Sequence, residues 1–239
     1  MPKTVDDAQA FITAAGITDP TQQSAIITLV TDLKGYGIWT KMKAIYPFVG
    51  GTATTHKFNL KDPRDLDVAF RMVFAGGWTH NSNGITGNGV NTTGNTKVAT
   101  SANLTTTSGA IGFYLRNLVS SNTYDFASST GVPYFGIALY VGTRYFFYGD
   151  PNLSSAVAGL PSPNFYSVSR IGGTHKGYSN GTVIRTTTSA STLPVQEITF
   201  RTNLRNYAFG YISEGLTDSE VANLYTAVQT FQTTLGRQI

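Results

Sequence analysis

The distribution of apolar positions is clearest near the C-terminus. From Val221 onward, apolar side chains recur at helical spacing and form a single stripe. Thr217 and Glu220 stand three residues apart just before this stripe, which is the spacing of a capping box. Gly236 follows the last apolar position and predicts the stop. The pattern therefore predicts a helix over 217–235, which must dock its apolar stripe on another part of the protein.

The N-terminal residues 1–37 also carry a helical pattern. One helix is predicted to end at Gly16, and a second to begin at Asp19-Pro20. This segment either packs on the rest of the chain or serves as an attachment arm that orders on a partner. The first helix is short and weakly apolar, so we favour attachment for residues 1–18. Its candidate contact residues are Phe11 and Ile12.

Residues 38–239 show a different period, with short runs in which apolar and polar positions alternate. Alternation over Leu66–Phe74 predicts a half-buried strand. Tyr134–Val141 and Arg144–Tyr148 flank Gly142-Thr143 and predict a hairpin, and residues 165–187 predict a three-stranded meander. Ten or more such strands indicate a mainly β domain of two packed antiparallel sheets, closed by the C-terminal helix.

Composition narrows the function classes. The 239 residues suffice for one large sandwich, and only 13% are charged, against about 25% in typical soluble domains. Ser, Thr, Asn and Gly take their place, which favours a protein that works in an assembly or outside a cell. The net charge of +4 is diffuse, and the pairs Lys41/Lys43 and Arg201/Arg205 are expected to be ordinary solvated charges. We expect neither nucleic acid binding nor membrane insertion, since no apolar run reaches 18 residues.

Candidate catalytic groups are sparse, and no catalytic residue is predicted. The three histidines, His56, His80 and His175, are far apart in sequence and have no metal-ligand spacing, so each is expected at the surface. Glycoside hydrolysis is a remote alternative. Asp65 and Asp67 would lie about 7 Å apart on one strand face, a distance that two catalytic carboxylates can have.

No cofactor is predicted. Calcium prefers several carboxylates, and the only local cluster is Asp62, Asp65 and Asp67, beside Arg64 in a turn, while Asp125 and Asp150 are isolated. A calcium site built mainly on carbonyl and Asn oxygens stays open but is not favoured.

Carbohydrate binding would use exposed aromatic rings with polar neighbours. Trp78 is followed by His80 and Asn81, and Tyr178 precedes Ser179-Asn180. The candidate ligand-binding residues are therefore Trp78, His80, Asn81 and Tyr178. Most other Tyr and Phe residues alternate as core positions do.

Three stretches carry a resemblance to a known family. Residues 37–47, 87–91 and 215–237, the last including Gly215-Leu216-Thr217-Asp218-Ser219-Glu220, resemble a family of tailed-bacteriophage virion proteins with a concanavalin A-like (laminin G-like) jelly roll. The resemblance implies a non-enzymatic virion structural protein, a head decoration or head fibre exposed on the particle. It also implies other virion proteins as partners and a homo-oligomer. The alternative is a glycan-binding receptor-recognition module of a tail fibre, with a host surface glycan as ligand.

Overall fold

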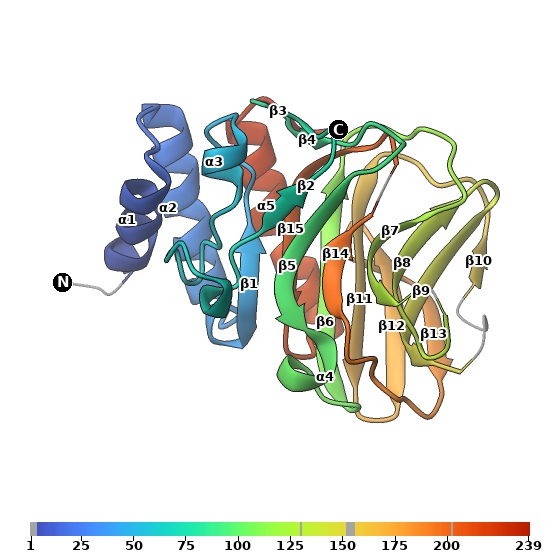
Figure 1. Cartoon of the computed structure of the whole chain (residues 1–239). Helices are drawn as coiled ribbons and strands as arrows, with labels where there is room; N and C mark the ends of the chain where they lie inside the picture. Colours follow the sequence, from blue (N-terminus) through green and yellow to red (C-terminus); the bar gives the residue numbers. More distant parts are fainter. Residues whose placement is uncertain (1–3, 130, 152–155, 202) are drawn as a thin grey trace.

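A computed structural model describes residues 4–129, 131–151, 156–201 and 203–239. Within these residues the strands form two antiparallel sheets that pack face to face, with the long helices on one outer side (Figure 1). The predicted mainly β sandwich is confirmed.

The strands of the described residues divide into a sheet of eight and a sheet of seven. In spatial order, the eight-stranded sheet contains β13 (Thr182–Thr188), β12 (Thr174–Ser179), β11 (Asn164–Ile171), β6 (Ser108–Leu115), β15 (Asn206–Ser213), β4 (Gly84–Thr86) and β3 (Thr79–Asn81), and β1 (Met42–Tyr46) also pairs with β15. The seven-stranded sheet contains β10 (Ala156–Ala158), β9 (Thr143–Asp150), β8 (Tyr134–Tyr140), β7 (Tyr124–Ser129), β14 (Glu197–Phe200), β5 (Thr93–Ala99) and β2 (Val73–Ala75). The helices are α1 (Thr4–Ala15), α2 (Pro20–Gly35), α3 (Ala53–His56), α4 (Thr100–Asn103) and α5 (Asp218–Thr234).

Strand alternation builds the core between the sheets. Phe126 of β7 and Phe200 of β14 are fully buried and stack with ring centroids 4.2 Å apart. Tyr124 and Ala127 of β7 and Thr199 of β14 lie on the opposite face of the seven-stranded sheet. One face of this sheet is thus packed, and no strand of the described residues forms a second layer on the other face.

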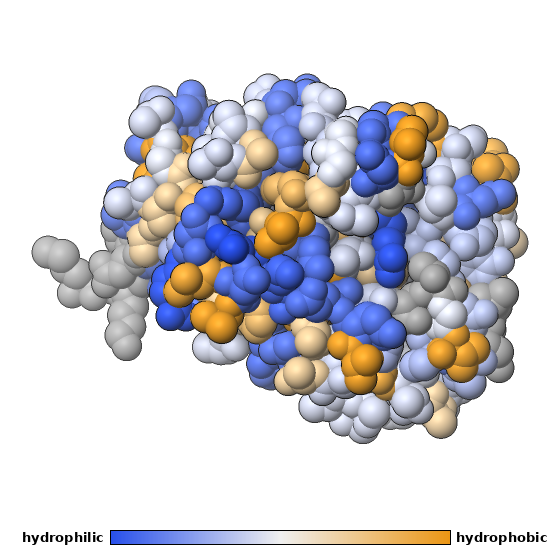
Figure 2. Space-filling view, in the orientation of Figure 1, coloured by the Kyte–Doolittle hydropathy of each residue, from blue (hydrophilic) through white to orange (hydrophobic). Residues whose placement is uncertain are grey.

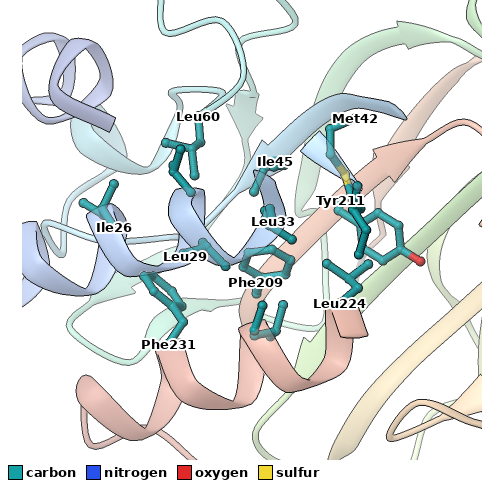
Figure 3. Packing of buried hydrophobic residues seen from close by; sticks show 14 of the residues in the cluster. Ile26, Leu29, Leu33, Met42, Ile45, Leu60, Phe209, Tyr211, Leu224 and Phe231 are labelled. Carbon is teal, nitrogen blue, oxygen red and sulfur yellow. The ribbon is translucent and has the colours of Figure 1, made fainter. Parts of the chain in front are cut away.

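The closing helix begins and docks as the sequence predicts. The hydroxyl of Thr217 accepts a hydrogen bond from the Glu220 backbone N–H at 3.3 Å, and the Glu220 carboxylate accepts one from the Thr217 N–H at 2.9 Å. The buried stripe of α5 packs with α2 on the outer face of the eight-stranded sheet, where Figure 3 shows Leu224 and Phe231 beside Phe209. None of the helices in the described part of the chain has the length and apolarity to cross a membrane.

Helix α1 packs against α2 rather than against the sheets (Figure 1). Asp7 pairs with Lys34 of α2 at 2.5 Å. Phe11 and Ile12 are only 1% and 4% exposed and belong to the same apolar cluster as α2 and α5. These two side chains, which the sequence offered as attachment residues, therefore contact the protein's own core.

The predicted strand over Leu66–Phe74 is wrong for most of its length. Asp67–Ala69 is a 3-10 turn, Phe70 has a left-handed backbone (φ 60°), and pairing begins only at Val73. The apolar alternation there does not mark a buried face, since Val68 is 74% exposed. Ion pairs of Arg71 with two aspartates hold the turn.

The hairpin and meander predictions are confirmed apart from one detail. Strands β8 and β9 pair from Tyr140 and Thr143 outward, so their turn is centred on Val141-Gly142, one residue earlier than expected. The meander β11-β12-β13 turns at Gly172-Gly173 and Asn180-Gly181. Positive φ values at Asn180 (48°) and Gly181 (74°) explain why these two residue types stand there.

Candidate functional site

The four predicted ligand-binding residues do not converge. Trp78, His80 and Asn81 lie at β3, on one edge of the eight-stranded sheet, whereas Tyr178 lies in β12 near the other edge. Five strand spacings separate β3 from β12, or about 24 Å. No single sugar ring can contact both ends.

The rings among these residues are largely used in packing. Tyr178 is 1% exposed, and its hydroxyl donates to Asp218 Oδ1 at 2.8 Å, so it has no open face on which a sugar could stack. Trp78 is half-buried against Phe74, and its indole N–H donates to the Thr93 carbonyl at 3.0 Å. Asn81 is exposed. Ligand binding by Trp78, His80 and Asn81 stays a prediction.

His80 forms a pair with His56 through their Nδ1 atoms, 3.0 Å apart. The backbone N–H of Gly51 donates to His56 Nε2 at 3.2 Å, so the His56 proton lies on Nδ1 and is donated to His80. Burial, then the charges of His80 and Arg237, lower the pKa of His56 to about 3, and burial also lowers the pKa of His80. The expectation of a surface histidine is wrong for His56, and it is equally wrong for the buried His175.

The His56–His80 pair predicts a loss of stability in acid. Unfolded histidine binds a proton below pH about 6.5, but folded His56 does so only near pH 3. Between these values the unfolded state binds more protons, so stability falls as pH falls. At pH 4.5 the loss from His56 alone is about 2–3 kcal/mol. Urea unfolding at several pH values checks this, with His56→Gln expected to show a shallower slope. Parallel curves for the two proteins would contradict it.

The outer face of the seven-stranded sheet carries an aromatic cluster that sequence reasoning missed. We call it the tyrosine face, and it consists of Tyr124 of β7, Tyr134 and Tyr140 of β8, and Tyr145 and Phe147 of β9. Tyr145 and Phe147 stack with centroids 5.3 Å apart, and Tyr134 stacks on Phe147 at 5.2 Å. Tyr140 meets Tyr145 edge-on at 5.2 Å. The rings therefore form one continuous surface.

The residues of the tyrosine face divide into a buried group and a partly exposed group. Phe147 and Tyr124 are buried, together with the small residues Ala127 and Ala138, while Tyr134, Tyr140 and Tyr145 are partly exposed. Ring-on-ring packing fixes the orientation of the exposed tyrosines, so little entropy is lost when a flat ligand stacks on them. Burial raises the pKa of Tyr140, so its phenol stays protonated well above neutral pH.

Polar side chains border the tyrosine face on the same side of the sheet. Strand β14 directs Glu197 and Thr199 outward, since Ile198 and Phe200 point into the core. Glu197 accepts a hydrogen bond from Asn95 of β5 at 2.6 Å. Figure 2 shows strongly hydrophilic side chains gathered over the part of this face nearest β2 and β5, and paler ones toward β8 and β9. Aromatic rings beside hydrogen-bonding groups are the components of a sugar site.

The sequence does contain a signal for this face. Strand β9 contains four successive aromatic residues, Tyr145, Phe146, Phe147 and Tyr148. Alternation assigns two of them to the core, and indeed Phe146 and Tyr148 belong to the cluster between the sheets. The other two must then lie on the opposite face, where an ordinary solvated strand would carry polar residues.

The acidic residues weighed for catalysis and calcium are engaged in ion pairs. Arg71 bridges Asp65 and Asp67 at 3.0 and 2.8 Å, and Asp62 pairs with Arg64 at 2.5 Å. Hydrogen bonds from Lys57 and Arg64 hold the pKa values of Asp65 and Asp62 below their usual range. Among the described residues, no group of three or more His, Cys, Asp and Glu side chains is arranged to hold a metal ion.

Two other aspartates are structural. Asp125 is fully buried and pairs with Arg205 at 2.6 Å, so the expectation that Arg205 is solvated is wrong. Asp150 is buried as well, and it accepts a hydrogen bond from Ser189 at 2.9 Å and lies 3.3 Å from His175. Both acids lie inside the sandwich, away from any surface on which a substrate could bind.

Comparison with known proteins shows similarity in fold but not in sequence. No protein-family model matches the chain, and no curated protein sequence matches it significantly. Among solved structures, it is similar to the binding domain of botulinum neurotoxin DC in complex with rat synaptotagmin II, with 14% identity and a TM-score of 0.55 over 80% of this chain and 53% of that chain. The chain is also similar to a structure of botulinum neurotoxin type C, a toxin whose cell entry depends on interaction with two ganglioside molecules. The identity is 13% and the TM-score 0.56, over 81% of this chain and 52% of that chain.

The serotype D/C binding domain matches similarly, with 14% identity and a TM-score of 0.56 over 80% and 53% of the two chains. The chain thus spans about half the length of these proteins. Identity this low defines the fold alone, which is a jelly-roll-like β-sandwich of the kind found in receptor-binding domains. These similar structures are binding domains rather than catalytic ones.

Proposed function

We propose that this chain is a non-enzymatic, glycan-binding jelly roll whose ligand stacks on the tyrosine face. The observation that carries the proposal is the cluster of five aromatic rings on the side of the sheet that has no second layer of strands, next to Thr199 and the Asn95–Glu197 pair. Sugar rings present flat C–H surfaces that pack on aromatic rings, while their hydroxyls need nearby donors and acceptors. Both components lie on one face here.

The fold relationship supports this proposal. One similar structure is a botulinum neurotoxin binding domain in complex with rat synaptotagmin II, and another is of a botulinum neurotoxin whose cell entry depends on interaction with two ganglioside molecules. Ganglioside binding is a property of that neurotoxin, and it makes a glycan ligand a reasonable expectation for a chain with this fold.

Glycoside hydrolysis is the weaker alternative for this chain. A glycosidase needs a carboxylic acid whose pKa is raised so that it can protonate the leaving group. Neighbouring cations instead lower the pKa of Asp65, and a guanidinium occupies the space between Asp65 and Asp67. We therefore propose binding without catalysis.

The first test is binding to a glycan array by the wild-type protein and by Tyr140→Ala and Tyr145→Ala variants. Removing one stacking ring is expected to weaken binding at least tenfold, because a central aromatic contact contributes roughly 2 kcal/mol. Tyr36→Ala is the matched control, since Tyr36 is 39% exposed at the end of α2, outside the tyrosine face. An array on which the wild-type protein binds nothing would refute the proposal.

We further propose that the chain works on a phage particle, as a head decoration, head fibre or tail-fibre module in a homo-oligomer. Support comes from the sequence resemblance to phage virion proteins, whose most distinctive part is the closing segment 215–237. That segment forms the capping box and the core-facing helix α5. A specific glycan ligand would favour the tail-fibre role, and labelling of purified particles tests the location.

A further inference from the structure

Arg201 is a partly buried cation at the border of the tyrosine face. It follows Phe200 at the end of β14, and its backbone N–H donates to the Asp125 carbonyl of β7 at 2.9 Å. Among the described residues, its guanidinium makes one hydrogen bond, from Nη2 to the Ser128 carbonyl at 3.3 Å. The Nε–H is buried and has no hydrogen-bond partner within the described part of the chain. A strongly polar group is thus left with unused donors beside an aromatic surface.

Within the part of the chain that the structure describes, Arg201 lacks the counter-charge that several other arginines of this protein have. Arg64, Arg71 and Arg205 each pair with an aspartate. Arg201 has no carboxylate within ion-pair distance among the described residues, and burial lowers its pKa. A partly desolvated guanidinium without an anion is costly, and an arriving anion would remove that cost.

The charge of Arg201 acts on the tyrosine face itself. The backbone of Arg201 is hydrogen-bonded to Asp125, the residue that follows Tyr124 on β7. Burial raises the pKa of Tyr124, and the positive charge of Arg201 opposes this rise. Glu197 stands four residues earlier on β14, roughly 13 Å away, and is bonded to Asn95. Arg201 therefore lies at the end of β14 beside Tyr124, and Glu197 borders the same face from the other end of the strand.

We infer that the tyrosine face is specific for acidic sugars, whose carboxylate or sulfate group pairs with Arg201 while the ring stacks on the tyrosines. The planar guanidinium offers parallel N–H donors that match the two oxygens of such a group. This inference rests on the proposed glycan-binding function and names the ligand class for it.

The experiment measures binding of matched probes, namely 3′-sialyllactose against lactose, and a glucuronate-containing or sulfated oligosaccharide against its neutral counterpart. The wild-type protein is expected to bind the acidic member of at least one pair tenfold or more tightly. Arg201→Gln should abolish that difference, while Arg201→Lys retains part of it. Arg64→Gln is the control, because it removes the same charge from an exposed arginine that pairs with Asp62 in the turn at residues 62–65. Comparison of the carboxylate-bearing probes with the sulfated probe shows which of the two acid groups the protein prefers.

The outcomes separate the inference from the proposed function. Equal binding of acidic and neutral probes, or a preference that survives in Arg201→Gln, overturns the inference and leaves glycan binding intact. No binding of any probe by the wild-type protein overturns both. Salt gives a second measurement that needs no variant, since added NaCl should weaken binding of the acidic probe far more than that of a neutral one. A salt-independent preference would also overturn the inference.

Discussion

Replacing Asp125 with alanine is expected to destabilise the protein by about 3–5 kcal/mol, or to prevent folding. The Asp125 carboxylate accepts hydrogen bonds from Arg205 Nη1 and the Tyr207 hydroxyl, both at 2.6 Å, and from the Leu139 N–H at 2.9 Å. All of these groups are buried. Without the carboxylate, the Arg205 guanidinium would remain in the core with no counter-charge, and the Tyr207 hydroxyl would lose an acceptor.

Urea unfolding of single and double variants checks this expectation. Combining Asp125→Ala with Arg205→Met removes both charges, so the double variant should lose less stability than the sum of the two single variants. Asp62→Ala is the control, because it breaks the ion pair with the exposed Arg64 and should cost no more than about 1 kcal/mol. Equal losses for Asp125→Ala and Asp62→Ala would show that the buried pair does not support the fold.

Deleting residues 1–18 is expected to lower the melting temperature by many degrees. The truncation removes Phe11, Ile12 and Ile17, each no more than 4% exposed. Each buried side chain of this size contributes roughly 1.5–3 kcal/mol, and the deletion also exposes the face of α2 that α1 covers. Thermal melting of a chain starting at Asp19 measures the loss.

The same truncation tests the attachment hypothesis for this segment. Phe11→Ala should lower stability, whereas Gln9→Ala, on the exposed side of the same helix, should not. If the truncated protein melts normally but fails to join phage particles, attachment is its main role. If it melts early and the protein that remains folded at low temperature still joins particles, attachment through residues 1–18 is refuted.

Local chemistry determined which parts of the structure could be predicted. The capping box of Thr217 and Glu220 lies within four residues, and the turn at Asn180-Gly181 needs only residues that accept positive φ. A helix stripe and a two-residue turn are specified by neighbours in sequence, so these elements, and with them the two-sheet sandwich, follow from the pattern alone.

Tertiary contacts decided the rest, including the candidate site. Alternation of side chains along a strand defines two faces. Which of these faces is buried depends on the other elements that pack against the strand. Tyr178 is buried because α5, some forty residues later, packs over it, and Arg205 is buried because Asp125, eighty residues earlier, lies beside it. Tyr145 is partly exposed because, in the part of the chain that the structure describes, no second sheet covers its side of β9. The sequence by itself determined the elements and their turns. Which aromatic rings meet solvent depends on how distant segments pack, because burial is a property of the whole assembly of layers and not of any one segment.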